Sequence, residues 1–405
     1  MRNIIFFVVA ICILGYLTAI QIETSLGYGT YESGFTINYS WPVVIFFCIT
    51  SFITLFTAGV AKIVKNNKVM KSFVILNLWI IVVSFVHFIY EPLSSFISYI
   101  LLLIQIPLSI CMYKYAVKES NTRYIRLTLL VFLLIMTYVF ITNLTLVQSF
   151  QTWNSANNAS YFVGYLVPLC FMVEKRYWKH ICFAIALYVM LSSFKRAGLI
   201  GLISCGVIYY YIELIFVNKD RTSKLKYYFI FFVFAILIII GVQYFLSENP
   251  FLSERFRMSE SGDSNRTETW SITWKLFCES DIFSQLFGHG YDQVIKHSSL
   301  GFSSHNDYLE ILYNYGLFGL ISFLYLIVSL VKCCVHMIRE KSEVASSFCS
   351  SVAYFLILIM MSHIVAYPYY FLYFSVSWAY MLGKYQVEKE HRITRVSQVM
   401  THLHN

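Results

Sequence analysis

Long runs of hydrophobic residues, separated by polar connections, make up most of the chain. A run of about 20 such residues forms an α-helix long enough to cross the hydrocarbon core of a bilayer. The pattern predicts about twelve spans, and we place them at 4–20, 42–61, 73–90, 96–113, 127–146, 161–173, 181–193, 197–217, 227–246, 316–335, 348–365 and 367–383. The first run is not followed by a signal-peptide cleavage site, so we expect it to remain as a helix. We predict an all-α membrane helix bundle, with one integral membrane domain over 1–405.

The composition agrees with this pattern. Hydrophobic residues make up 58% of the chain and charged residues only 13%, whereas soluble domains carry about 25% charged residues. These values exclude disordered proteins and small disulfide scaffolds. Nine of the ten cysteines lie in apolar runs or beside one, which is typical of small core residues. The net charge of +9 indicates basic cytoplasmic loops rather than a nucleic-acid partner.

The distribution of Lys and Arg predicts which connections face the cytoplasm. Basic residues concentrate in one set of alternate connections, whereas the opposite connections at 21–39, 91–95 and 148–160 contain none. Basic loops remain on the cytoplasmic side of a membrane. We therefore expect a membrane protein with both termini cytoplasmic, including a basic tail at 384–405.

Two outward segments depart from this charge rule. A short turn before the eighth span carries Lys195 and Arg196, and the longest connection, at 247–305, also contains several basic residues. Long loops in compact proteins are usually functional. We expect 247–305 to be a large outward loop and the functional site to lie on this side.

One part of this loop has the pattern of an amphipathic helix. Asn265 is a candidate N-cap with Glu268 at the third helical position. Apolar residues then follow at helical spacing, namely Trp270, Trp274, Phe277 and Cys278. We expect this face to lie on the bilayer or against the bundle. Arg266 would stand in the first turn, where a helix amino end attracts anions such as phosphate. The alternative is a surface arginine paired with a nearby carboxylate.

A second helix start is predicted near the end of the loop. Ser304 is a candidate N-cap with Asp307 at the third position, which places His305 in the first turn. The helix dipole disfavours an imidazolium there, so His305 should be neutral and able to accept a proton. The alternative is a histidine that only caps the helix or lies at the interface. Gly316 and Gly319 mark where this helix meets the tenth span and allow close backbone approach.

Other kinds of chemistry lack support in the sequence. His289, His297 and His305 recur every eight residues, which matches no metal-ligand pattern. The chain has no Asp-x-Asp pair for a nucleotide-sugar metal and no phosphate-binding Gly-x-x-x-x-Gly-Lys loop. We therefore expect neither a metal nor another cofactor.

Three motifs resemble the bacterial O-antigen ligase and polymerase superfamily. The ligase signature is His, then Asn, Ser or Gln, nine residues, Gly, two residues, and Gly, Thr or Tyr. His305 and Asn306, followed by Gly316 and Gly319, match it completely. The segment from Arg266 to Trp270 is similar to the family's Arg-x-x-x-Trp. The turn at 193–196 resembles its Ser-x-Ser-Arg, with Lys in place of the second Ser.

The resemblance implies a GT-C-like fold in a bacterial inner (cytoplasmic) membrane, with 247–305 as a large periplasmic loop. It also implies inverting glycosyl transfer at the periplasmic face. Its donor would be an undecaprenyl-pyrophosphate-linked oligosaccharide, and the lipid pyrophosphate would be the leaving group. Arg266 and Arg196 would stabilise that leaving group, and His305 would accept the proton of the incoming hydroxyl. Candidates for substrate binding are Lys195, Asn306, Asp307 and Glu310.

Three functions remain open at this point. A polymerase joins lipid-linked repeats, whereas a ligase transfers the glycan to the lipid A core. The His-Asn pair is followed by Tyr308-Leu309-Glu310, as in many polymerases, and with the short basic tail this favours a polymerase. That resemblance also implies a chain-length regulator as a partner, besides membrane lipid. A transporter or flippase is the third reading, although Glu213, the main acid inside a span, lies near the cytoplasmic end.

Overall fold

The computed structural model describes residues 60–88, 96–118, 161, 163–172, 176–193, 196–217 and 266–404, with isolated positions at 229, 233, 236, 240 and 243. The helices are α3 (Val60–Asn66), α4 (Lys68–Phe88), α5 (Phe96–Lys118), α8 (Arg176–Ser193), α9 (Arg196–Ile212), η1 (Glu213–Val217), α12 (Arg266–Glu279), α13 (Ile282–Phe287), α14 (Gln293–His297), α15 (Asp307–Arg339), α16 (Ala345–Met361) and α17 (Pro368–His404). Residues 163–170 are also helical, and no strand occurs among the described residues. The prediction of an all-α protein is confirmed.

Four described helices are long and apolar enough to cross a bilayer, at Lys68–His87, Leu101–Lys118, Ala197–Phe216 and Asp307–Arg339. They coincide with the predicted spans at 73–90, 96–113, 197–217 and 316–335. Shorter apolar helices at Trp178–Leu191 and Ala345–Met361 fall on the predicted spans at 181–193 and 348–365. The spans predicted at 4–20 and 127–146, and most of those at 42–61 and 227–246, lie outside the described residues. The total of twelve therefore stays a prediction.

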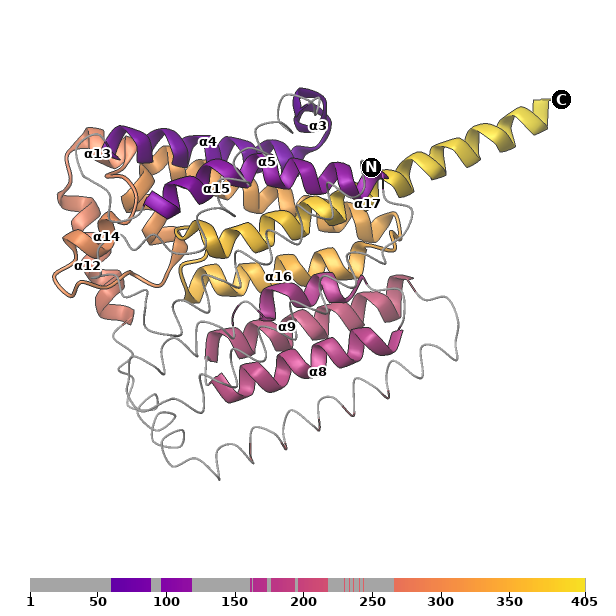
Figure 1. The fold of residues 1–405 in the computed structure, drawn as a ribbon, viewed down its shortest axis with the longest axis horizontal. Coiled ribbons are helices and arrows are strands. Elements are labelled where there is room, and N and C mark those ends of the chain that lie inside the picture. Colours follow the sequence, from indigo (N-terminus) through magenta and orange to yellow (C-terminus); the bar gives the residue numbers. More distant parts are fainter. Residues whose placement is uncertain are drawn as a thin grey trace.

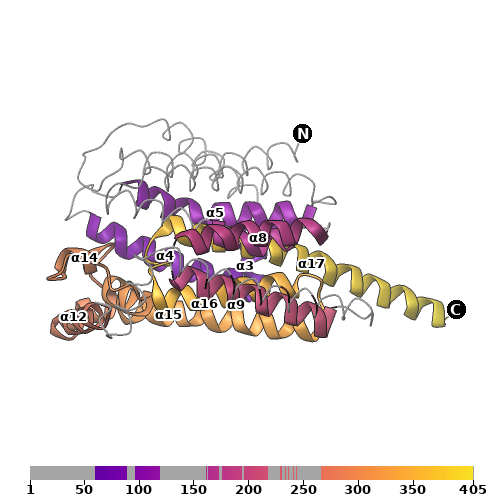
Figure 2. The same ribbon diagram turned by 90° about the horizontal axis from the view of Figure 1, so that it is seen from below.

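The long helices run side by side, with α17 along α5, α9 along α16 and α15 along α4. Figure 1 shows the short helices α12, α13 and α14 gathered at one end of this bundle, where α12, α13 and α14 all pack against α15. The last part of α17 extends beyond the opposite end, as the second view also shows (Figure 2). The two ends of the bundle therefore differ in structure.

Aromatic side chains fill the interior between these helices. The buried ring of Tyr165 lies 6.1 Å from that of Tyr354 and 5.1 Å from that of Phe374. Gly201 makes room for Tyr354, because a β-carbon there would lie 2.5 Å from the tyrosine ring. The buried Trp378 donates its indole N–H to the Ser351 hydroxyl at 3.0 Å, which satisfies its only polar atom. This packing holds α9, α16 and α17 together.

Helix α15 is interrupted at Gly316, where the predicted loop helix meets the tenth span. Gly316 has φ +69°, and a β-carbon there would collide with the Leu286 carbonyl oxygen. Gly288, with φ +90°, makes the reciprocal approach to the α15 backbone. Only glycine adopts such conformations with little strain. The carbonyl of Tyr315, freed by the break, accepts the Trp79 indole N–H at 2.8 Å.

Helix α12 begins at Arg266, as predicted. The expectation that its apolar face lies on the bilayer or against the bundle stays a prediction. Its buried residues are Thr269 and Thr273, whereas Trp274 is 53% exposed and Cys278 is also exposed. Each threonine hydroxyl donates to a carbonyl of the preceding turn, to Arg266 at 2.9 Å and to Thr269 at 2.8 Å. Because these hydroxyls are satisfied locally, the threonine methyl groups can pack against the bundle.

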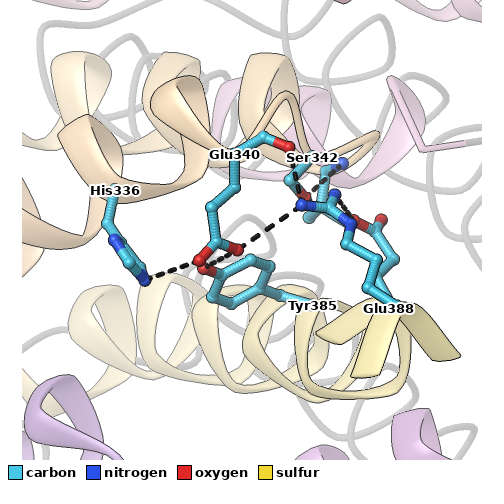
Figure 3. A network of polar contacts seen from close by, with 7 residues as sticks. His336, Glu340, Ser342, Tyr385 and Glu388 are labelled. Carbon is cyan, nitrogen blue, oxygen red and sulfur yellow. Dashed lines mark hydrogen bonds and ion pairs between the residues drawn. The ribbon is translucent and has the colours of Figure 1, made fainter. Parts of the chain in front are cut away.

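The segment expected as a tail, 384–405, continues α17 as a helix to His404. A polar network attaches it to the end of α15 and is drawn in Figure 3. The Glu340 carboxylate accepts the Tyr385 hydroxyl at 2.7 Å and lies 3.0 Å from His336 Nε2. Arg392 donates to the Glu340 carbonyl at 2.6 Å, and Glu388 accepts the Ser342 hydroxyl at 2.7 Å.

Candidate functional site

A hydrogen bond joins the helix that begins with Arg266 to the turn that contains His305. Arg266 is the first residue of α12, and Trp270 follows one turn later. The Trp270 indole N–H donates to the Ser304 carbonyl at 2.9 Å, immediately before His305. Two motifs that stand more than 30 residues apart in the chain therefore meet at the end of the bundle that carries α12 to α14 (Figure 1).

His305 stands in a tight turn before α15 rather than in its first helical turn. Its φ of +52° is left-handed, a conformation in which histidine is more common than most residues. The predicted N-cap Ser304 is corrected to Asn306, whose side-chain oxygen accepts from the Tyr308 and Leu309 amides at 3.0 and 3.4 Å. Asparagine caps a helix as well as serine does. The Ser304 hydroxyl instead donates within the turn, to the Asn306 carbonyl at 3.1 Å.

A second histidine lies against the first. The rings of His305 and His363 are stacked with centroids 4.7 Å apart and planes inclined by 26°. His363 belongs to the connection between α16 and α17, and its Nδ1 lies 2.7 Å from the Ser303 hydroxyl. The Ser303 oxygen also accepts the His305 backbone N–H at 3.3 Å. Tyr367 flanks the pair, with its ring 4.5 Å from that of His363.

Asp307 is fully buried and anchors the connection that carries His363. Its carboxylate oxygens accept three consecutive backbone amides, Ile364, Val365 and Ala366, at 2.7 to 3.0 Å. Hydrogen bonds to a charged acceptor contribute about 1.5–3 kcal/mol each. With its oxygens occupied in this way, Asp307 is placed to hold the loop rather than to contact a substrate.

Glu310 is buried one turn further along α15 and has a similar role. It accepts the Ser304 amide at 2.6 Å and lies 3.5 Å from the Asn314 side-chain nitrogen. The Asn314 oxygen in turn accepts the Val294 amide at 3.1 Å. The two acids expected to bind substrate therefore support the turn that presents His305.

Tyr161 links the cationic segments to the histidine pair. It interacts electrostatically with Arg266, and its hydroxyl is hydrogen-bonded to Ser362, the residue before His363. Its ring also lies against Gly198, in the first turn of α9, where a β-carbon would be 3.2 Å from the tyrosine ring. Arg196, the first residue of α9, is therefore at the same end of the bundle. Lys195 lies outside the described residues.

His289, His297 and Tyr313 form a second cluster of titratable groups in this region. His289 stacks on Tyr313 at 4.4 Å, and His297 Nδ1 lies 2.6 Å from the Tyr313 hydroxyl. Burial lowers the pKa of His289, and the nearby His297 acts in the same direction. Burial also raises the pKa of Asp292 to about 6. Within the described part of the chain, no three His, Cys, Asp or Glu side chains are arranged to hold a metal ion.

The comparison with protein families agrees with the geometry. Residues 181–324 match the family model of the O-antigen ligases. These residues form a domain of the O-antigen ligase family. The resemblance seen in the motifs to the O-antigen ligase and polymerase superfamily is thereby confirmed. None of the curated proteins compared with the chain matches it.

The O-antigen ligase domain contains the motif residues and indicates a function of the ligase or polymerase type. It covers α9 and α12 to α14 and continues into α15, so that Arg196, Arg266 and His305 all lie within it. Members of this family are glycosyltransferase-like enzymes of the ligase or polymerase type, which implies lipid-linked glycan substrates and a membrane setting. The apolar helices described above fit that setting.

Two residues of the site lie outside the O-antigen ligase domain and were missed from the sequence. Tyr161 precedes the matched segment and His363 follows it. A signal for His363 exists, because it is a histidine near the outward end of the span predicted at 348–365, where ionisable residues are rare. Tyr161 carries no such signal, since it is one of 32 tyrosines and begins an apolar run.

Proposed function

We propose that this protein is an O-antigen (surface polysaccharide) polymerase, which joins undecaprenyl-pyrophosphate-linked oligosaccharide repeats at the periplasmic face of the inner membrane. The observation that carries the proposal is the bond from Trp270 to the Ser304 carbonyl. It brings the helix that begins with Arg266 onto the turn that presents His305. A fixed cation and a proton acceptor in one place are what pyrophosphate-leaving glycosyl transfer needs.

In the proposed reaction, a sugar hydroxyl of the acceptor attacks the anomeric carbon of the donor. The bond from that carbon to the pyrophosphate oxygen breaks, and its electron pair leaves with undecaprenyl pyrophosphate. The hydroxyl proton passes to the imidazole of His305. Arg266 and Arg196 stabilise the charge on the leaving pyrophosphate, for which a planar guanidinium is suited, and Lys195 and Asn306 assist binding.

The choice of a polymerase rests on the sequence that follows the histidine. His305-Asn306 runs into Asp307-Tyr308-Leu309-Glu310, as in many polymerases, and we infer a chain-length regulator as a partner. The specific alternative is an O-antigen ligase that transfers the glycan to the lipid A core. The complete ligase signature ending at Gly319 and the description of the matched family favour it.

A gel of surface lipopolysaccharide from a deletion strain separates these functions. Loss of a polymerase leaves a single repeat on the core, whereas loss of a ligase leaves bare core and polymer on the lipid carrier. An unchanged ladder in the deletion strain would contradict both functions and direct attention to capsular polymer or transport.

Complementation with His305→Ala tests the mechanism in the same strain. We expect a loss of about 10²–10⁴-fold in transfer, the usual contribution of a general base. His391→Ala is the matched control, because His391 is exposed on the far part of α17 and should restore the ladder fully. A flippase would tolerate both substitutions.

A further inference from the structure

His363 is held in place by its neighbours on both sides. Ser362, before it, is hydrogen-bonded to Tyr161. The three residues after it donate their amides to the buried carboxylate of Asp307 at 2.7 to 3.0 Å. Two separate helices therefore determine where this short connection lies, and His363 is not a freely placed loop residue.

Two contacts of the His363 side chain lead toward His305. Its ring stacks on His305 with a centroid distance of 4.7 Å, and its Nδ1 is 2.7 Å from the Ser303 hydroxyl. Ser303 itself is buried and accepts the His305 backbone N–H. The stacking contact reaches the ring of His305, and the contact with Ser303 leads to the backbone N–H of His305.

We propose that His363 is a positioning residue, which fixes the imidazole of His305 by stacking so that it meets the acceptor hydroxyl in one orientation. This inference rests on the proposed function, because it assigns His363 a role in that transfer. The left-handed backbone of His305 leaves its side chain at the tip of a turn. A flat neighbour at stacking distance restricts its rotation there. Preorganisation of this kind matters because a misplacement of about 1 Å can cost about 10²-fold in rate.

Three substitutions at one position separate the two contacts. His363→Phe keeps a flat ring against His305 but loses the bond to Ser303. His363→Asn keeps a polar group near the place of Nδ1 but loses the stacking, and His363→Ala loses both. The full-length protein in membranes of the deletion strain is assayed with lipid-linked oligosaccharide extracted from that strain. Rates are normalised to the amount of folded protein.

We expect His363→Ala and His363→Asn to lower kcat by about 10–100-fold with little change in KM for the donor, and His363→Phe to stay within a few-fold of wild type. Activity in His363→Asn together with inactive His363→Phe would overturn the stacking role. Unchanged kcat in His363→Ala would overturn it as well.

A chemical readout at His305 distinguishes positioning from general damage. Diethyl pyrocarbonate acylates accessible imidazole nitrogens, and peptide mass spectrometry follows each histidine separately. Loss of the stacked ring in His363→Ala should raise the modification rate of His305 several-fold, while His297, in a separate cluster, serves as the internal reference. Equal rates at His305 in wild type and His363→Ala would contradict the proposal.

The same assay separates failure of this inference from failure of the proposed function. If His305→Ala transfers glycan normally, the proposed mechanism fails and the role of His363 falls with it. If His305→Ala is inactive while His363→Ala equals wild type, only the inference about His363 is wrong.

Discussion

The carboxylate of Asp307 shows how one side chain can join two parts of the candidate site. It lies at the first position of α15 and is fully buried, and both of its oxygens accept backbone amides of the connection between α16 and α17. A carboxylate has two oxygens with about four acceptor sites, which is enough for three consecutive N–H groups. The residue therefore ties the helix behind His305 to the loop that carries His363.

Replacement of Asp307 should cost stability as well as activity. In Asp307→Ala, three buried amides lose their acceptor, and each unsatisfied amide costs about 1–3 kcal/mol. We therefore expect the free energy of unfolding to fall by at least about 3 kcal/mol. Asp307→Asn keeps one side-chain oxygen, so its stability should lie between those of the wild type and Asp307→Ala. Thermal unfolding in detergent measures this loss.

Asp281→Ala is the matched control for this prediction. Asp281 also accepts a backbone amide, that of Ser284 at 3.1 Å, but it is exposed. Its loss should lower the unfolding temperature much less than the loss of Asp307 does, because water can replace the carboxylate at an exposed helix start. If both variants unfold at the same temperature, Asp307 does not have the anchoring role described.

At the residue scale, the sequence located the candidate residues, but it did not predict their contacts. The motif spacing pointed to Arg266, His305, Asp307 and Glu310, and the structure places all four at one end of the bundle. Their contacts depend on the packing of α12 and of the α16–α17 connection, which no local pattern specifies. The prediction of Ser304 as the cap is wrong for the same reason. Ser and Asn are equally suited to cap a helix, and only the turn at His305 decides between them.

At the scale of elements, the break in α15 determines where the site stands relative to the span. Two backbone segments touch at Gly316 and Gly288, and His289 and Gly290 donate their amides to carbonyls of α15 at 3.2 and 2.8 Å. The loop after α13 is thereby joined to the helix that begins beside His305. The sequence predicted this meeting point at Gly316 correctly, because the positions of glycines can be read directly from the local sequence.

Gly316→Ala should therefore be much more damaging than its size suggests. The alanine would be strained by the positive φ and would also collide with the Leu286 backbone. We therefore expect the free energy of unfolding to fall by about 3 kcal/mol or more. Gly301 offers a matched control, since its φ of +64° is similar but nothing lies within 4 Å of an added β-carbon. Gly301→Ala should cost only about 1 kcal/mol.

Thermal unfolding and ladder formation both measure this difference. Equal melting temperatures for the two alanine variants would mean that the backbone contact between Gly316 and Leu286 contributes nothing. A lost ladder in Gly316→Ala at normal protein level would show that the break also positions the site.

For the whole molecule, the two ends of the bundle carry different polar structures. One end holds the histidine pair and α12 to α14, and the other holds the network around Glu340 (Figures 1 and 3). Hydropathy alone predicted the helices between them, because apolar length is a local property. It ended the last span at 383, whereas α17 continues to His404. Contacts of Tyr385 and Arg392 with Glu340, and of Glu388 with Ser342, hold this continuation against the end of α15.

The separation of the two ends predicts that the Glu340 network contributes to stability and not to transfer. Glu340→Ala removes the Tyr385 bond at 2.7 Å and the contact with Arg392 at 3.5 Å, and we expect a loss of about 1–2 kcal/mol because the network is partly exposed. Glu279→Ala is the control, since its pair with Lys275 is largely exposed and should contribute less than about 0.5 kcal/mol. Transfer per folded molecule should equal wild type in both variants. A Glu340→Ala protein that folds normally but makes no ladder would show that the two ends are coupled.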